Sequence, residues 1–139
     1  MRFNSLDGKI RSVDLNKINA CRNVRASKIQ NNVYNILEGI YGSHAILQDF
    51  IIPGTKLSVD FFIPSFSLVI EVDGNQHDKF NSFFHNSRKD LIKQQGRDDN
   101  KEKWCQINNL IIVRVKEKDK VTKNSLISMI VEAIRKQSE

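Results

Sequence analysis

Residues 59–77 read VDFFIPSFSLVIEVDGNQH, and this segment carries the strongest indication of the fold. Two apolar runs, LSVDFFI (57–63) and LVIEVD (68–73), stand on either side of the short link PSFS. Runs of this length that end at Pro, Ser or Gly are typical of β-strands. So short a link between them favours a hairpin. The sequence therefore predicts two paired strands, the second of which ends at a glycine turn.

The alternation of side chains along a strand assigns faces to these two runs. The residues predicted to share an apolar face are Leu57, Val59, Phe61 and Ile63 in the first run and Leu68, Ile70 and Val72 in the second. Asp60, Glu71 and Asp73 are predicted on the opposite faces. Half-buried carboxylates on adjacent strands are unfavourable unless something compensates their charge, so these acids are the first candidates for a functional site.

Helical periodicity precedes the strands. Apolar residues recur at helical spacing over residues 29–40, which predicts an amphipathic helix. Ser27 and Gln30 fit a capping box at its start, and Gly42 suits its end. Between this helix and the hairpin, the run AILQDFII (45–52) predicts a further strand.

The segment after the hairpin begins with a long polar stretch. A second helix is predicted to start at Asp98 or Asp99 and to end near Asn108. The run NLIIVRV (109–115) follows as a strand that is apolar enough for a sheet interior. A last amphipathic helix is predicted over about 124–137. Its inward residues are predicted to be Leu126, Ile127, Ile130, Ala133 and Ile134.

The chain has 139 residues and a mass of 16.1 kDa, which favours a single domain. Residues 1–23 are polar and mixed in charge and predict an irregular basic N-terminal arm, which leaves residues 24–139 as that domain. An apolar fraction of 40% and a charged fraction of 27% exclude disordered and low-complexity classes. No run approaches the roughly 18 to 20 apolar residues of a membrane span, and no secretory signal or disulfide framework stands out. We therefore expect a cytoplasmic protein with no membrane partner, and the net charge of +6 is compatible with nucleic acid.

Acidic residues and a histidine lie on or just after the two hairpin strands. Asp60 is on the first strand, Glu71 and Asp73 end the second, and His77 follows the glycine turn. Carboxylate oxygens are ligands that Mg²⁺ prefers, and a bound Mg²⁺ can polarise a phosphate. A histidine can move the proton of an attacking water near neutral pH. The pattern indicates metal-assisted phosphodiester hydrolysis, and surface acids paired with nearby lysines are the alternative.

The same residues carry a resemblance to a known family. VDFFIPSFSLVIEVDGNQH (59–77) and RDDNKEKWCQINNLIIVRV (97–115) resemble the PD-(D/E)xK nuclease superfamily. Within it, the similarity is to the very-short-patch-repair endonuclease branch, with its uncharacterised bacterial relatives and phage homing endonucleases that have an EDxHD active site. The resemblance covers about residues 27–115. It implies a restriction-endonuclease-like α/β fold, an αβββαβ core with a mixed sheet flanked by helices, and makes residues 24–139 a single nuclease domain.

The resemblance implies a metal-binding role for three residues. Asp60 takes the place of the metal-binding aspartate of the second strand, and Glu71 takes the D/E position. The carbonyl of Val72 would be a backbone ligand. Asp73 stands at the catalytic position where many superfamily members have lysine. The implied cofactor is Mg²⁺.

The resemblance also implies residues for proton transfer. His77 takes the place of the branch's catalytic histidine, and Asp98 that of the acid that orients it. Two alternatives stay open, in which Asp98 is a helix N-cap or the neighbouring Asp99 takes the role. The first-helix glutamate of the branch, a catalytic position, falls on Gln30, for which the capping box is the favoured role. The polar pair 75–76 replaces the aromatic pair of repair enzymes, which argues against mismatch recognition but not against nuclease activity.

The resemblance implies a Mg²⁺-dependent endonuclease that hydrolyses phosphodiester bonds in double-stranded DNA. Because the branch that it resembles includes free-standing phage homing enzymes of similar size, the resemblance favours a site-specific phage-type homing enzyme, which would act in the host cell cytoplasm. A repair nickase, a branched-DNA nickase and a non-catalytic DNA-binding protein stay open. A homodimer formed through the last helix would double the readable site. The predicted phosphate contacts, for which a solvated helix face is the alternative, are Arg88, Lys89, Lys93, Arg97, Lys101 and Lys103.

Overall fold

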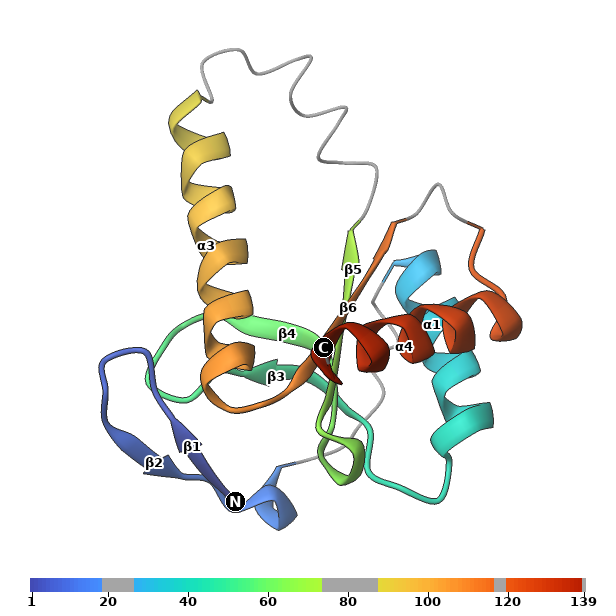
Figure 1. Ribbon diagram of the computed structural model, residues 1–139, viewed down its shortest axis with the longest axis horizontal. Coiled ribbons are helices and arrows are strands. Elements are labelled where there is room, and N and C mark those ends of the chain that lie inside the picture. Colours follow the sequence, from blue (N-terminus) through green and yellow to red (C-terminus); the bar gives the residue numbers. More distant parts are fainter. Residues whose placement is uncertain (19–26, 74–87, 117–119, 139) are drawn as a thin grey trace.

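A four-stranded mixed sheet in the order β3-β4-β5-β6 forms the centre of the computed structural model (Figure 1). The structure describes residues 1–18, 27–73, 88–116 and 120–138, with only the backbone of residues 88–91 and 94. The strands are β3 (Leu47–Ile51), β4 (Ser58–Ile63), β5 (Leu68–Asp73) and β6 (Ile111–Lys116). Pairing is antiparallel from β3 to β5 and parallel between β5 and β6. The expected α/β fold with a mixed sheet is confirmed.

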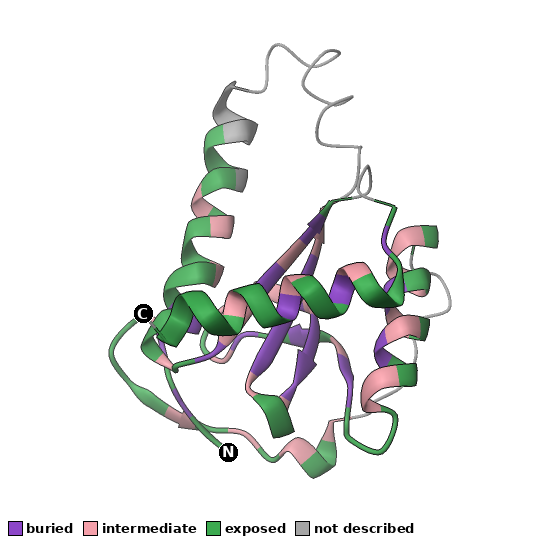
Figure 2. Cartoon of the chain, turned by 45° about the vertical axis from the view of Figure 1, so that its right-hand side comes forward, coloured by how far each residue is buried: buried purple, intermediate pink, exposed green. Residues whose placement is uncertain are grey.

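Helices lie on both faces of this sheet (Figures 1 and 2). The elements are α1 (Lys28–Tyr41), α3 (Arg88–Ile107), α4 (Lys123–Ser138) and the short 3-10 helix η2 (Pro64–Phe66) in the β4–β5 link. Apolar residues of α1 and α4 join one core cluster with side chains of the sheet, while the buried end of α3 joins a second cluster with the other face. The observed order α1-β3-β4-β5-α3-β6-α4 is the order that the sequence patterns predict.

Helix α3 starts at Arg88, ten residues before the predicted start at Asp98 or Asp99. Its first three turns have no apolar stripe that a periodicity argument could detect. Among the side chains of α3 that the structure describes, those that enter the core are in its C-terminal part, where Trp104 and Cys105 are 0% and 1% exposed. Asp98 therefore lies in the interior of a helix, and the N-cap alternative for this residue is wrong.

The N-terminal residues form an ordered hairpin where an irregular arm is predicted. Strands β1 (Arg2–Asn4) and β2 (Ile10–Ser12) pair antiparallel, and the 3-10 helix η1 (Leu15–Lys17) follows. Phe3 is 1% exposed, and its ring centroid lies 5.4 Å from that of Trp104. The Asn4 backbone N–H donates to Asn108 Oδ1 at 2.7 Å. One buried aromatic residue in a polar segment gives no periodic signal, which is why the sequence pattern misses this contact.

Helix α4 buries a narrower stripe than the sequence predicts. Leu126 and Ile130 are buried, and Ala133 packs against them. Ile127 and Ile134, predicted inward, are 37% and 45% exposed. The helix packs along β6, the edge strand of the sheet, so only one side of it faces apolar residues.

Candidate active site

Two carboxylates lie where the pairing of β4 and β5 stops. The register pairs Phe61 with Ile70, so Asp60 is across from Glu71 at the next position. There the Asp60 backbone N–H donates to Glu71 Oε1 at 3.2 Å. In return, the Val72 backbone N–H donates to Asp60 Oδ2 at 2.7 Å. Each side chain is thus held by the backbone of the other strand, which brings the two predicted acids together.

The face pattern of β4 changes at Asp60. Val59 packs in the core cluster of α3, whereas Phe61 packs in the core cluster of α1 and α4. Strict alternation would place both on one face, so the predicted shared face for residues 57–63 is wrong. Across from Asp60 on β3, Asp49 has a left-handed backbone with φ of 54°. The pairing of β3 with β4 is interrupted at Asp49 and is present on either side of it. Aspartate is among the non-glycine residues that adopt this conformation most readily, so the irregularity is tolerated here.

Gln30 of α1 contacts this site instead of completing a capping box. Ser27 Oγ accepts the Gln30 backbone N–H at 3.3 Å, as expected for an N-cap. The Gln30 side chain turns away from the cap, and its Nε2 donates to Asp60 Oδ1 at 3.2 Å. The favoured capping role of that side chain is therefore wrong. Gln30 therefore contributes a neutral amide, and no charge, next to the Asp60 carboxylate.

Lys101 of α3 places a positive charge beside the pair. Its Nζ lies 3.3 Å from Glu71 Oε2, and its side chain is 16% exposed. Sequence analysis predicts Lys101 as one of six phosphate contacts and misses its position at the acids. The register of α3 over the sheet decides this contact, and the two residues are 30 positions apart in the chain.

Burial gives the carboxylate pair unusual electrostatics. Glu71 is 4% exposed, and its burial, together with the nearby Asp60 charge, raises its pKa to about 7 against the opposing effect of Lys101. Burial also raises the pKa of Asp60, although the hydrogen bond from Val72 opposes this. The half-buried Asp73 adds a smaller repulsion that raises the Asp60 pKa further. The Lys101 ammonium thus lies beside one buried and one half-buried carboxyl group, both of which have a raised pKa.

This donor set fits Mg²⁺. Mg²⁺ is commonly bound through one or two carboxylates, with water and substrate phosphate oxygens as the remaining ligands. Asp60, Glu71 and the carbonyl of Val72 are the groups that would hold it. Across the ranges that the structure describes, no three His, Cys, Asp or Glu side chains converge on one point. The pair would therefore depend on backbone, water or phosphate oxygens for the rest of the coordination.

Asp98 lies against Arg114 of β6. A guanidinium nitrogen of Arg114 donates to the Asp98 carbonyl at 3.2 Å, and another lies 3.7 Å from its carboxylate. Arg114 Nε also donates to Glu102 Oε1 at 3.2 Å, so this arginine links α3 to the edge strand β6 through hydrogen bonds. Asp99 is exposed. The predicted partner of Asp98, His77, lies outside the described residues, and so do the side chains of Arg88 and Lys89.

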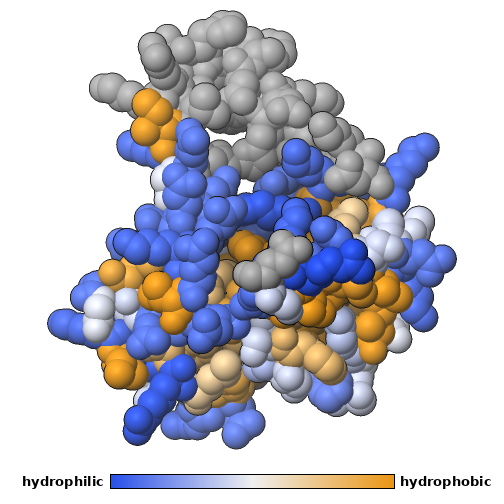
Figure 3. Space-filling view, in the orientation of Figure 1, coloured by the Kyte–Doolittle hydropathy of each residue, from blue (hydrophilic) through white to orange (hydrophobic). Residues whose placement is uncertain are grey.

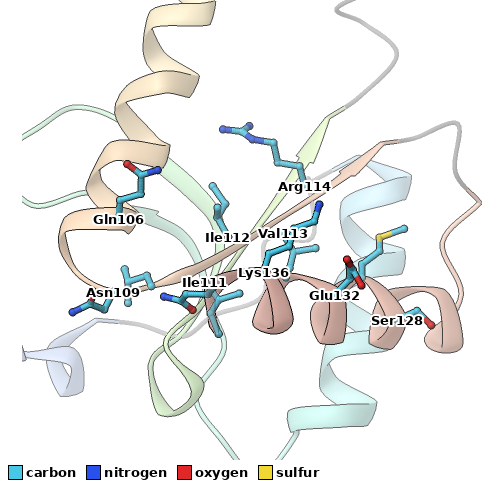
Figure 4. A pocket seen from close by; sticks show the side chains of 13 residues that line it. Gln106, Asn109, Ile111, Ile112, Val113, Arg114, Ser128, Glu132 and Lys136 are labelled. Atoms are coloured by element: carbon cyan, nitrogen blue, oxygen red, sulfur yellow. The ribbon is translucent and has the colours of Figure 1, made fainter. Parts of the chain in front are cut away.

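An open groove follows β6. Figure 4 shows it between the end of α3, β6 and α4, with Gln106, Ile112 and Glu132 among the side chains around it. Of the predicted site residues that the structure describes, none lines it. The carboxylate pair is the candidate site because of its charge and burial.

Stability is expected to fall as the pH rises from about 4.5 to about 7. An unfolded chain releases the Glu71 proton at its ordinary pKa of 4.5, whereas the folded protein holds it up to about 7. Because the folded state binds more protons in this window, its free energy of unfolding decreases with rising pH. The full contribution is present below pH 4.5, and its loss amounts to roughly 3 kcal/mol.

Urea unfolding at pH 5 and pH 8 measures this effect. Glu71→Gln should flatten the pH dependence, while Glu132→Gln, at an α4 side chain that is 54% exposed, should leave it unchanged. An unaltered pH dependence in Glu71→Gln would show that burial of this carboxyl is not its source.

Comparisons with known proteins find viral relatives of part of this chain. The chain is 38% identical over 64 residues to uncharacterized protein 033L of Invertebrate iridescent virus 3, a match over 46% of this chain and 33% of the viral protein. It is 36% identical over 60 residues to uncharacterized protein 307L of Invertebrate iridescent virus 6, over 43% and 30% of the two chains. No family model matches the sequence, and no solved structure matches it. The chain thus spans about a third of the length of these viral relatives.

No helix of the described ranges is long and apolar enough to cross a membrane.

Proposed function

We propose that this protein is a Mg²⁺-dependent endonuclease that hydrolyses phosphodiester bonds in double-stranded DNA on a restriction-endonuclease-like fold. The pair of the half-buried Asp60 and the buried Glu71, each held by a backbone N–H of the adjacent strand, carries the proposal. The element order α1-β3-β4-β5-α3-β6 supports the fold assignment. The net charge of +6 supports a polyanionic substrate.

Several residues of the site have a part in this proposal. Asp60, Glu71 and the Val72 carbonyl would hold Mg²⁺, which when bound would supply positive charge at the phosphate and make water more acidic. The backbone N–H groups of Asp60 and Val72 fix the carboxylate orientations. Gln30 fixes the other oxygen of Asp60. A preorganised acceptor set of this kind needs no rearrangement at the moment of reaction.

The finer proposal is a site-specific phage-type homing endonuclease in the host cell cytoplasm. Relatives in invertebrate iridescent viruses support a viral setting. Exposed apolar side chains at Ile127, Val131 and Ile134 of α4 support the proposed homodimer. The neutral Gln30 favours the second candidate, a non-catalytic DNA-binding protein. A repair or branched-DNA nickase would differ from the homing enzyme in substrate form.

Cleavage of a supercoiled plasmid library that carries randomised inserts, and so includes the site of a site-specific enzyme, tests the proposal. Nicked or linear DNA should accumulate with Mg²⁺ and should be absent when EDTA replaces it. Intact plasmid at all protein concentrations, with DNA still bound in a gel-shift assay, would favour the non-catalytic candidate. Substrates with a mismatch or a four-way junction, run in parallel, separate the nickase alternatives.

Replacing His77 with alanine is expected to lower the cleavage rate at least about 100-fold. The motive is its position after Glu71, Asp73 and the glycine turn, where an imidazole can accept a proton from the attacking water. DNA affinity should change little, because phosphate contacts come from other residues. Single-turnover cleavage and equilibrium binding measure the two quantities separately. His77→Gln is the matched variant, and wild-type cleavage by His77→Ala would end this assignment.

A further inference from the structure

Three cations of α3 lie on one face of the helix. Residues four apart share a helix face, and Lys93, Arg97 and Lys101 have this spacing. Lys101 contacts Glu71, and Trp104, three residues further on, is 0% exposed in the core. The three cations, here called the cationic stripe, therefore continue the inward face of α3 from the core past the carboxylates.

Other charged side chains of α3 that the structure describes lie on other sides of the helix. Asp98 and Glu102 lie on an adjoining side, where Arg114 of β6 engages both. Lys103 is exposed and comes two residues after Lys101, which is about 200° around the helix. Among the described side chains of α3, Lys103 is thus a cation outside the stripe, and it faces away from Lys101.

The stripe lacks compensation along its free length. Lys93 and Arg97 are exposed, and within the described part of the chain neither forms an ion pair. Like charges at this spacing destabilise a helix, so an isolated stripe is unfavourable. In the view of Figure 3, the surface of α3 that is visible below the grey atoms is mostly hydrophilic. An anionic partner would remove the repulsion.

The length of the stripe matches a nucleic-acid strand. Eight residues of α-helix rise by about 12 Å, from Lys93 to Lys101. Phosphates of one DNA strand advance by about 3.4 Å each, so three or four of them cover the same length. We propose that the cationic stripe binds the phosphates of one DNA strand and leads it to the pair of Asp60 and Glu71, and that Lys103 takes no part. This inference rests on the proposed function. Of the predicted phosphate contacts whose side chains the structure describes, it keeps the three on one face of α3 and excludes Lys103.

Binding of a short fluorescent DNA duplex, measured in EDTA by anisotropy, tests the stripe. Lys93→Met and Arg97→Met should each weaken binding by roughly 5- to 10-fold at about 100 mM salt. Each should also reduce the slope of log affinity against log salt by about 0.9, because one phosphate contact is lost. Lys103→Met is the matched control on the same helix and should bind within about twofold of the unaltered protein. All three side chains are exposed, so circular dichroism should show an unchanged fold.

Two other outcomes separate the stripe from the proposed function. Equal weakening by Lys103→Met and Lys93→Met, or an unchanged salt slope in Lys93→Met and Arg97→Met, would overturn the stripe while leaving nuclease activity open. If the unaltered protein bound no DNA, or bound it with an affinity that did not depend on salt, both the proposal of DNA as the partner and the proposed role of the stripe would be contradicted.

Discussion

Asp60→Asn should lower Mg²⁺-dependent DNA cleavage by roughly 1000-fold or more. Positive charge held at a phosphate contributes several kcal/mol to transition-state stabilisation, and this substitution removes one of the two carboxylates proposed to hold the ion. The replacement has the same size and retains an oxygen that can accept the Val72 N–H. It also removes the charge that raises the Glu71 pKa by repulsion. The variant should therefore fold at least as well as the unaltered protein.

Three measurements on the Asp60→Asn variant test this prediction. Single-turnover cleavage should be almost lost, thermal unfolding should be unchanged or shifted upward, and DNA affinity in EDTA should not decrease. Asp99→Asn carries the same charge change on the exposed side of α3 and tests the competing acid of the sequence-based hypothesis. Cleavage by Asp60→Asn within about tenfold of the unaltered rate would contradict the proposed metal site.

Phe3→Ala should reduce the free energy of unfolding by about 3 to 5 kcal/mol, the usual effect of truncating a buried phenylalanine. The ring is 1% exposed and has aromatic neighbours at Phe50, Phe62 and Trp104. Its loss would leave a cavity that relaxation of the neighbours fills only in part. Because the hairpin of β1 and β2 packs on the buried end of α3 through this residue, that end of α3 should also become less protected.

Urea unfolding and amide hydrogen exchange measure these two effects. Ile10→Ala is the matched control, since Ile10 is on the partner strand of the same hairpin and is 67% exposed. Its cost should be about 0.5 kcal/mol or less. Similar losses in both variants would mean that the hairpin contributes through its backbone and not through the Phe3 ring.

Much of this protein follows from patterns between residues close together in the chain. Apolar runs bounded by turn residues predict β3 to β6. An apolar period of 3.6 residues predicts α1 and α4, because helix geometry places those residues on one side. Asp60 and Glu71 could be assigned to neighbouring strands because the link between the strands is too short for any other arrangement. The sequence also indicates that these two acids are in an unusual environment, because carboxylates within apolar strands require something that compensates their charge.

Contacts between distant residues decided the rest. Gln30 reaches Asp60 across 30 positions, and Lys101 reaches Glu71 across another 30. No local spacing encodes either contact, because each depends on how a helix is docked over the sheet. The change of face at Asp60, the docking of Phe3 and the exposed side of α4 have the same origin. Periodicity tells which side of an element is apolar, whereas packing between elements selects the polar side chains that meet at the site.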